Sequence, residues 1–161
     1  MKMEIRAALR GDALLIAMLN ADVQVVHARG VPDMFKPPLL DANIVQQFEA
    51  DIADPTHFFF VAETDGEPVG YLFAILQQRS ESSRHLKHEM IYVNHLSVKP
   101  ENRRQGVGRA LLDAAKEVGK QRGINRMALD VWRFNEDARR FFVGYVLEVY
   151  NEKMWMELGP K

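Results

Sequence analysis

The chain has 161 residues and no cysteine, and its 21 Lys and Arg against 22 Asp and Glu leave a formal net charge of −1. This balance gives no general attraction to nucleic acid or to an anionic membrane. The missing cysteine excludes disulfides, thiolate metal sites and cysteine nucleophiles. The length fits a single domain over residues 1–161. Neither a signal peptide nor an apolar stretch of about 20 residues is present, which predicts a cytoplasmic protein outside the membrane.

The spacing of apolar residues predicts an alternation of strands and helices. In chain order these are a strand at 3–9, helices at 14–26 and 40–52, strands at 57–63, 68–77 and 90–98, a helix at 107–120, a strand at 127–131, a helix at 136–145 and a strand at 154–158. Asp65-Gly66 supply the positive φ of a tight hairpin turn, and Gly123 is expected to cap a helix. The proline-rich segment 30–38 is expected to be a loop near the mouth of a site.

One stretch carries most of the chemical information. Residues 103–109 read RRQGVGR and lead from a predicted strand into a predicted helix, so the helix N-terminus would offer backbone N–H groups and a positive dipole to an anion. Gly106 and Gly108 permit close approach of the backbone, and three arginines add charge. The stretch predicts a phosphate or pyrophosphate site, unless its glycines only shape a turn. Two common nucleotide motifs do not fit this spacing. A P-loop needs Lys and then Ser or Thr after the last glycine, where this chain has Arg109 and Ala110, and the dinucleotide fingerprint needs glycine or alanine where Leu111 stands.

The order and spacing of these residues resemble the GNAT superfamily, the N-acetyltransferases that use acetyl-CoA. Residues 103–108 match its central motif of Arg or Gln, two residues, Gly, one residue, and Gly or Ala. The stretch NEDARRFF, 135–142, resembles the second motif, and 61–76 resembles the hairpin before the cofactor strand. The resemblance covers nearly the whole chain, least well at 79–89. It implies an α/β (α+β) fold with a mixed, mostly antiparallel central sheet flanked by helices.

The resemblance also implies how acetyl-CoA would be bound, without a metal. Backbone N–H groups of the central motif would hold the pyrophosphate, and the end of the preceding strand would face the pantetheine arm beside a bulge near Asn94 to Leu96. Asn135 would contact pantetheine, cap its helix, or do both. The cofactor-binding residues implied are Leu96, Ser97, Val98, Arg103, Arg104, Gln105, Gly106, Val107, Gly108, Arg109, Asn135, Ala138, Phe141 and Phe142.

The catalytic groups are less defined. Phe142 stands where the family commonly has a tyrosine that protonates the departing thiolate, and a phenyl ring has no proton to give. Tyr145, one turn later, is either a substitute acid or a packed aromatic. Glu89 and His95 are candidates for the base that deprotonates the attacking amine, although each also fits a structural role. Asn94 has no carboxylate to act as a base. Positioning and strand N–H groups are a further source of catalysis.

These features predict an enzyme that transfers an acetyl group from acetyl-CoA to a primary amine by direct attack in a ternary complex. The acceptor is a small-molecule amine or an amino group of a peptide or protein, and the loops at 80–88 and 31–38 are expected to wall its site. A non-catalytic CoA or acyl-CoA sensor and a protein-interaction module are the alternatives. A homodimer is a further expectation from the resemblance, through the terminal strand. Nucleic acid and membrane are not expected partners.

Overall fold

The computed structural model describes residues 1–159, which divide into two compact units, Met1–Asp130 and a second that begins at Val131. In the first unit the elements are β1 (Met3–Ala7), η1 (Arg10–Asp12), α1 (Ala13–Gly30), α2 (Ala42–Ala53), β2 (His57–Thr64), β3 (Glu67–Arg79), β4 (His88–Val98), η2 (Pro100–Asn102), α3 (Val107–Gln121) and β5 (Met127–Leu129). The second unit contains α4 (Glu136–Gly144). Among these helices none is long and apolar enough to cross a membrane.

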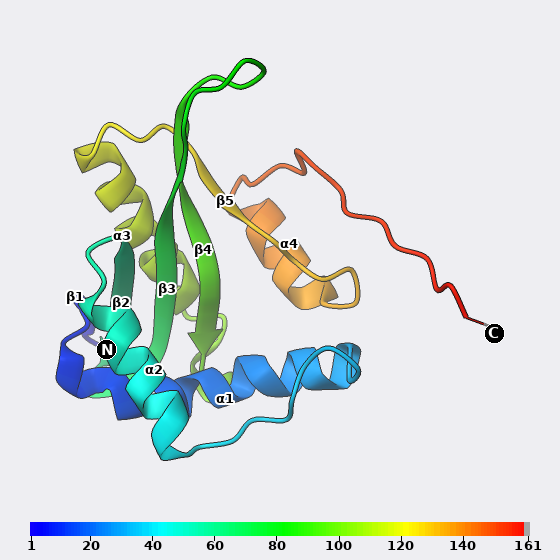
Figure 1. Cartoon of the computed structure of the whole chain (residues 1–161). Helices are drawn as coiled ribbons and strands as arrows, with labels where there is room; N and C mark the ends of the chain where they lie inside the picture. The colour runs from blue at the N-terminus through cyan, green and yellow to red at the C-terminus, as the bar shows by residue number, and fades with distance from the viewer. Residues whose placement is uncertain (160–161) are drawn as a thin grey trace. The chain divides into compact units, whose positions relative to one another are not determined.

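The first unit is built on a five-stranded sheet in the order β1-β2-β3-β4-β5 (Figure 1). The first four strands pair antiparallel, and β5 runs parallel to β4. Asp65 and Gly66 both have positive φ, 50° and 85°, which is the geometry of the tight turn predicted between β2 and β3. The mixed, mostly antiparallel sheet predicted from the resemblance is therefore confirmed.

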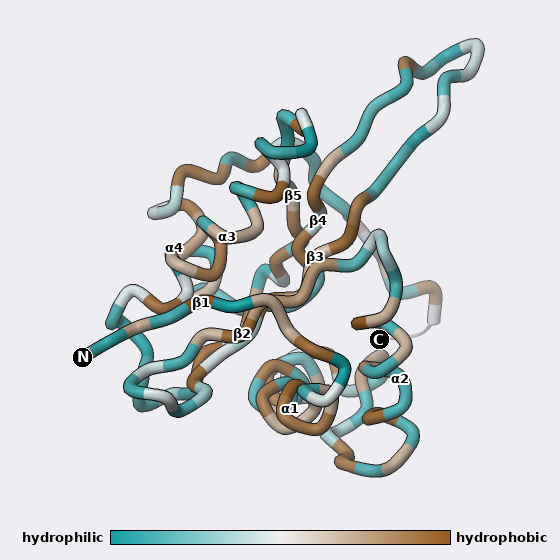
Figure 2. Tube along the Cα trace, turned by 90° about the vertical axis from the view of Figure 1, so that its left-hand side faces the viewer, coloured by the Kyte–Doolittle hydropathy of each residue, from teal (hydrophilic) through white to brown (hydrophobic). Residues whose placement is uncertain are grey.

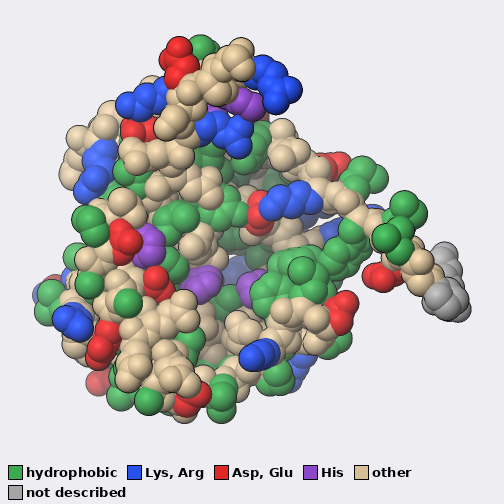
Figure 3. Space-filling view, in the orientation of Figure 1, with side chains coloured by type: hydrophobic (Ala, Val, Ile, Leu, Met, Phe, Trp, Pro, Cys, Tyr) green, Lys and Arg blue, Asp and Glu red, His purple; other side chains and the backbone are tan. Residues whose placement is uncertain are grey.

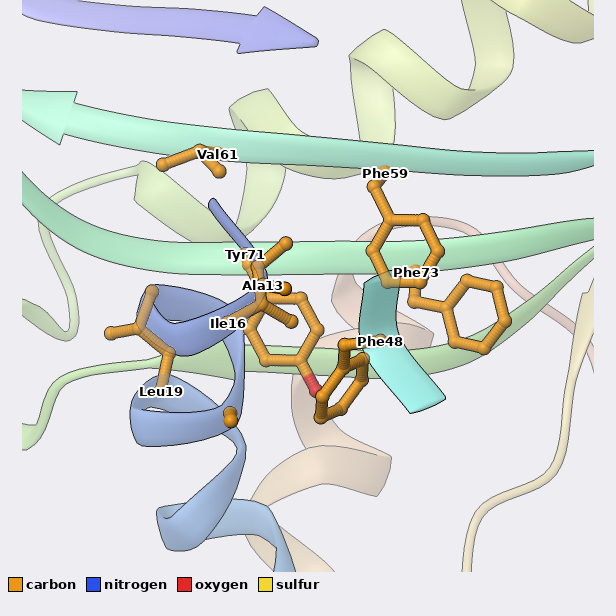
Figure 4. Packing of buried hydrophobic residues seen from close by; sticks show 9 residues of the cluster. Ala13, Ile16, Leu19, Phe48, Phe59, Val61, Tyr71 and Phe73 are labelled. Atoms are coloured by element: carbon orange, nitrogen blue, oxygen red, sulfur yellow. The ribbon is translucent and has the colours of Figure 1, made fainter. Parts of the chain in front are cut away.

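Helices cover both faces of this sheet. Figure 2 shows α1 and α2 on one side and α3 on the other. The main core, drawn in Figure 4, lies between the sheet and the first two helices. Its buried members are Ala13, Ile16, Ala17, Leu19, Phe48, Phe59, Val61, Tyr71 and Phe73. On the opposite face, an added Cβ on Gly119 of α3 would lie 3.3 Å from Cγ1 of Ile91. Ile91 therefore points toward α3.

Gly123 determines where α3 ends. Gly123 has φ +70°, its N–H donates to the carbonyl of Lys120, and the N–H of Ile124 donates to the carbonyl of Gly119. These two bonds make the Schellman arrangement, in which the left-handed residue is usually glycine. The expected cap at Gly123 is confirmed, and the chain turns back to form β5.

The second unit holds one short helix and an extended C-terminal segment. The Asn135 side chain accepts a hydrogen bond from the Ala138 N–H at 3.2 Å, so it caps α4 as anticipated. The predicted strand at 154–158 is wrong, because the described residues of this segment pair with no strand. Met154, Trp155 and Met156 are largely exposed, not core. Alternating apolar residues suit a strand, but a strand also needs a partner for its N–H and C=O groups.

Candidate active site

The RRQGVGR stretch forms a loop whose backbone φ alternates in sign. Arg103 has φ −68°, Arg104 +64° and Gly106 +86°, and Gln105 is not among the described residues with positive φ. Left-handed residues within a turn are one way in which a chain directs successive N–H groups toward an anion. Two side chains hold the loop in place: Arg103 Nε donates to the Val98 carbonyl at 3.1 Å, and Gln105 Nε2 donates to the Glu101 carbonyl at 3.0 Å. The loop is thus attached to the end of β4.

The loop ends at the N-terminus of α3, where Gly106 is the N-cap. No side chain caps this helix, and its first turn contains no acidic residue. The first helical hydrogen bond is the one from the Ala110 N–H to the Gly106 carbonyl, so the preceding turn directs N–H groups outward. Glycine is needed at 106 because the backbone is left-handed there, with φ +86°. Space is not the reason, since nothing lies within 4 Å of an added Cβ. N–H groups, helix dipole and nearby arginines together suit a pyrophosphate.

The strand leading into this loop has an open edge. β4 pairs with β3 along its full length but with β5 only at Ile91–Val93. Between Phe73 and Ala74 of β3 the register shifts, because they pair with His95 and Val93, and Asn94 becomes an extra residue. This bulge lies within the range that the resemblance implies. After it, no strand of the described chain pairs with the β5 side of Leu96, Ser97 and Val98, although the Val98 carbonyl accepts from Arg103 Nε. This edge could therefore pair with an extended ligand.

The bulge also decides which face His95 occupies. Side chains alternate along a strand, so Ile91 and Val93 point toward α3 and an unbroken strand would send His95 there too. The extra residue reverses the alternation. His95 contacts Asn20 of α1, and the Ser97 hydroxyl donates to the Leu19 carbonyl at 2.7 Å. The bulge therefore places His95 on the face covered by α1 and α2.

His95 is surrounded by aromatic and polar side chains. Its Nδ1 lies 3.0 Å from the Tyr71 hydroxyl, and the rings of Phe48 and Phe73 approach it edge-on at 6.5 and 5.5 Å. Burial, together with repulsion from His27, lowers the pKa of His95 to about 4. A histidine with this pKa is neutral near pH 7 and is a weak proton acceptor.

Glu89 lies at the other end of β4. Its carboxylate accepts a hydrogen bond from Gln78 Nε2 at 2.6 Å, and the two residues pair across β3 and β4. It is six positions before His95, roughly 20 Å at the rise of a strand. The two candidate bases therefore do not face the same reacting centre. Tyr71 and Asn20, which the sequence did not single out, are the groups that contact His95.

The remaining predicted residues belong to the second unit. Asn135 caps α4, Ala138 follows in the first turn, and Phe141 and Phe142 pack against each other with ring centroids 5.3 Å apart. Tyr145 ends the helix and is 8% exposed. At the end of this helix Val146 has φ +78°, and the Leu147 N–H donates to the Phe142 carbonyl.

Charged side chains concentrate at one further place in the first unit. Figure 3 shows Lys, Arg and His side chains over the tip of the β3–β4 hairpin, where the sequence has Arg84, His85 and Lys87. His85 and His88 lie in this segment, but among residues 1–159 no three His, Asp or Glu residues come together as a metal site. This tip is the segment expected to wall the acceptor site.

Comparison with known proteins places this geometry in a family. Residues 27–145 match the model of the acetyltransferase (GNAT) family. The chain belongs to the GNAT family. A curated relative, an uncharacterized N-acetyltransferase in the pepI 3′ region of Lactobacillus delbrueckii subsp. lactis, is 26% identical over 66% of this chain and 60% of its own. The chain thus spans less than two thirds of the length of the curated relatives it matches.

Solved structures share the GNAT fold over almost the whole chain. A tetramutant of the BH1408 protein from Bacillus halodurans is 25% identical and superposes with a TM-score of 0.89, over 96% of this chain and 99% of that one. The structure of AAC(6')-Iy in complex with the bisubstrate analogue CoA-S-monomethyl-acetylneamine is 18% identical, with a TM-score of 0.72 over 99% and 100% of the two chains. At 18% identity, this similarity shows that the two chains share a fold and nothing more.

Proposed function

We propose that the chain transfers an acetyl group from acetyl-CoA to a primary amine. The observation that carries this proposal is the anion-binding loop at the N-terminus of α3, attached directly to the open edge of β4. The N–H groups from Arg104 to Gly108, with Arg109, would hold the pyrophosphate of acetyl-CoA. The Arg103 N–H, expected to join them, donates instead to the Pro100 carbonyl at 3.3 Å. The β4 edge at Leu96–Val98, which β5 does not cover, would bind the pantetheine arm in the way a sheet edge binds an extended chain.

In this proposal the amine attacks the thioester carbonyl directly. The amine nitrogen forms the new C–N bond, the C–S bond breaks, and the proton lost by the nitrogen replaces the acetyl group on CoA, through water. Strand N–H groups near the bulge would polarise the carbonyl, and positioning supplies much of the rate. No acyl-enzyme forms, because the chain has no cysteine and no serine in a nucleophile setting.

The second unit contributes the residues of the second motif. Asn135, Ala138, Phe141 and Phe142 are proposed to line the pantetheine slot. Because Phe142 has no hydroxyl, Tyr145 is the proposed acid toward the thiolate. Replacement of Tyr145 by Phe should lower kcat and remove the basic limb of its pH profile. An unaltered pH profile would mean that water, and not Tyr145, protonates the departing CoA thiolate.

The test combines binding and turnover on the full chain. Acetyl-CoA is titrated by calorimetry, and free CoA thiol is then measured against a panel of small amines and peptides with free N-termini. Binding followed by thiol release with one class of amine is the expected result. Binding without release across the whole panel would favour the acyl-CoA sensor, and the absence of binding would refute the assignment of the loop.

A homodimer is also proposed, with its contact at the exposed C-terminal segment. The side chains of Met154, Trp155, Met156 and Leu158 are 67–92% exposed, an arrangement that is typical of an interaction site. Sedimentation of the full chain should give the mass of a dimer, and a chain ended before Met154 should give that of a monomer. A monomeric full chain would exclude this contact.

A further inference from the structure

Three polar side chains from three elements meet inside the core beside the site. Asn20 of α1 donates through Nδ2 to the Tyr71 hydroxyl at 2.7 Å, and this hydroxyl lies 3.0 Å from Nδ1 of His95. Tyr71 is 0% exposed and Asn20 is 8% exposed. Figure 4 shows the Tyr71 ring extending from β3 between Ile16 and Phe48, with its hydroxyl at the far end. Core packing therefore fixes the position of this hydroxyl.

The directions of these hydrogen bonds determine where His95 carries its proton. The Tyr71 oxygen accepts from Asn20, so its own proton needs an acceptor, because a buried hydroxyl proton without one is costly. The acceptor that the structure offers is Nδ1 of His95. Asn20 Nδ2 also lies 3.5 Å from the same Nδ1, which again requires a lone pair there. A neutral imidazole that accepts at Nδ1 carries its hydrogen on Nε2.

The other ring nitrogen of His95 is open. All hydrogen bonds of the His95 side chain go through Nδ1. Among the described residues, the buried side-chain polar atom without a partner is the Thr64 hydroxyl, so the unpartnered Nε2 of His95 reaches solvent. It does so on the α1 and α2 side of β4, next to the bulge at Asn94.

We infer that His95 is a neutral hydrogen-bond donor that holds an oxygen of the amine substrate through Nε2–H, and that Tyr71 and Asn20 are positioning residues that fix this tautomer. The inference rests on the proposed function, and it deepens that function by naming a substrate feature. The acceptor carries a carbonyl, hydroxyl or carboxylate oxygen close to its amine. A simple alkylamine lacks this oxygen and is a poorer substrate.

This role replaces the role of base for His95. A base needs a free lone pair directed at the amine, but the lone pair of His95 is at Nδ1 and is occupied by the Tyr71 hydroxyl. The titratable groups that act on His95 from the elements packed against it are Tyr71 of β3 and His27 of α1. Burial raises the pKa of Tyr71 and both histidines have a lowered pKa, so all three are neutral near pH 7.

The tautomer is measured directly by nitrogen NMR of the imidazole rings in the full chain. The five histidines are distinguished by comparison with His95→Gln, in which the signals of His95 disappear. For His95 we expect a protonated Nε2 and an unprotonated Nδ1 at pH 7. In Tyr71→Phe, which keeps the ring and removes the hydroxyl, the proton should redistribute between the two nitrogens. A protonated Nδ1 in the unsubstituted protein would overturn the inference.

The substrate role is measured with the amine that gives the fastest thiol release. His95→Leu, which removes the donor, should raise the KM for this amine about 3- to 10-fold, the effect of one neutral hydrogen bond. His95→Gln keeps an N–H donor and no base, so it should raise KM less and keep an acidic limb in the pH profile. Tyr150→Phe, which removes the hydroxyl of an exposed tyrosine, is the matched control for Tyr71→Phe.

The outcomes separate this inference from the function on which it rests. Equal loss of kcat in His95→Gln and His95→Leu, with the acidic limb gone in both, would make His95 the base and overturn the donor role. The absence of turnover with every amine would overturn the proposed function, and the substrate role with it. In that case the NMR measurement still decides the tautomer.

Discussion

The positive φ of Gly106 makes a single added methyl group a sensitive probe of the loop. In Gly106→Ala the new Cβ meets nothing within 4 Å, so the cost comes from the backbone, which has φ +86°. An L-residue in the left-handed region costs about 1–2 kcal/mol. If the loop relaxes when empty and must return to this conformation on binding, the Kd of acetyl-CoA rises about 5- to 30-fold. If it does not relax, the free energy of unfolding falls instead, by about 1 kcal/mol once the smaller entropy of the unfolded alanine chain is included.

The assay is calorimetric titration with acetyl-CoA, paired with urea unfolding of the same sample. Gly11→Ala is the control, because Gly11 has no positive φ and nothing within 4 Å of its Cβ. It should change neither quantity by more than about 0.5 kcal/mol. Wild-type affinity together with wild-type stability in Gly106→Ala would refute both the strained geometry and its place in binding.

Three further substitutions or conditions test other parts of the structure. In Asn135→Ala the N–H of Ala138 loses its cap, so thermal unfolding should show a loss of about 0.5–2 kcal/mol, whereas Asn135→Ser should stay close to wild type. In Gly70→Ala the new Cβ would lie 2.6 Å from the Ser97 carbonyl oxygen, so separation of β3 from β4 should cost roughly 1–3 kcal/mol in urea unfolding; unchanged stability would contradict this close approach. The pKa of His95 is about 4 in the folded state against about 6.5 for an unperturbed histidine, so its neutral form stabilises the fold above pH 6.5. This contribution, up to about 3 kcal/mol, should be lost as pH falls from 6.5 to 4. If His95→Gln keeps the wild-type dependence of the unfolding free energy on pH, the assignment is refuted.

Local signals in the sequence predicted most of the first unit. The hairpin at Asp65-Gly66, the cap at Gly123 and the loop before α3 each depend on a residue whose backbone preference is visible in the sequence. The same reasoning found Gly106, whose φ of +86° is a conformation that glycine adopts readily. The bulge at Asn94 came from the resemblance alone, since no residue in β4 indicates which position is extra.

Long-range features were not predictable in this way. Tyr71 lies 24 positions from His95 in the sequence, and Asn20 lies 75 positions from His95. A tyrosine in an apolar strand gives no sign of the partner of its hydroxyl. The predicted strand at 154–158 was wrong because pairing depends on a partner elsewhere, which alternation does not supply. The φ of +78° at Val146 was not predictable either, because a β-branched residue rarely adopts a positive φ.

The most direct test of the account is a comparison of acetyl-CoA with S-acetylpantetheine, which carries the same thioester and arm but no pyrophosphate. Both are titrated into the full chain by calorimetry at the same ionic strength. If the loop at the N-terminus of α3 holds the pyrophosphate, acetyl-CoA should bind and S-acetylpantetheine should bind at least 10-fold more weakly, since charge-assisted hydrogen bonds contribute about 1.5–3 kcal/mol each. Equal affinity for the two compounds would contradict the central claim.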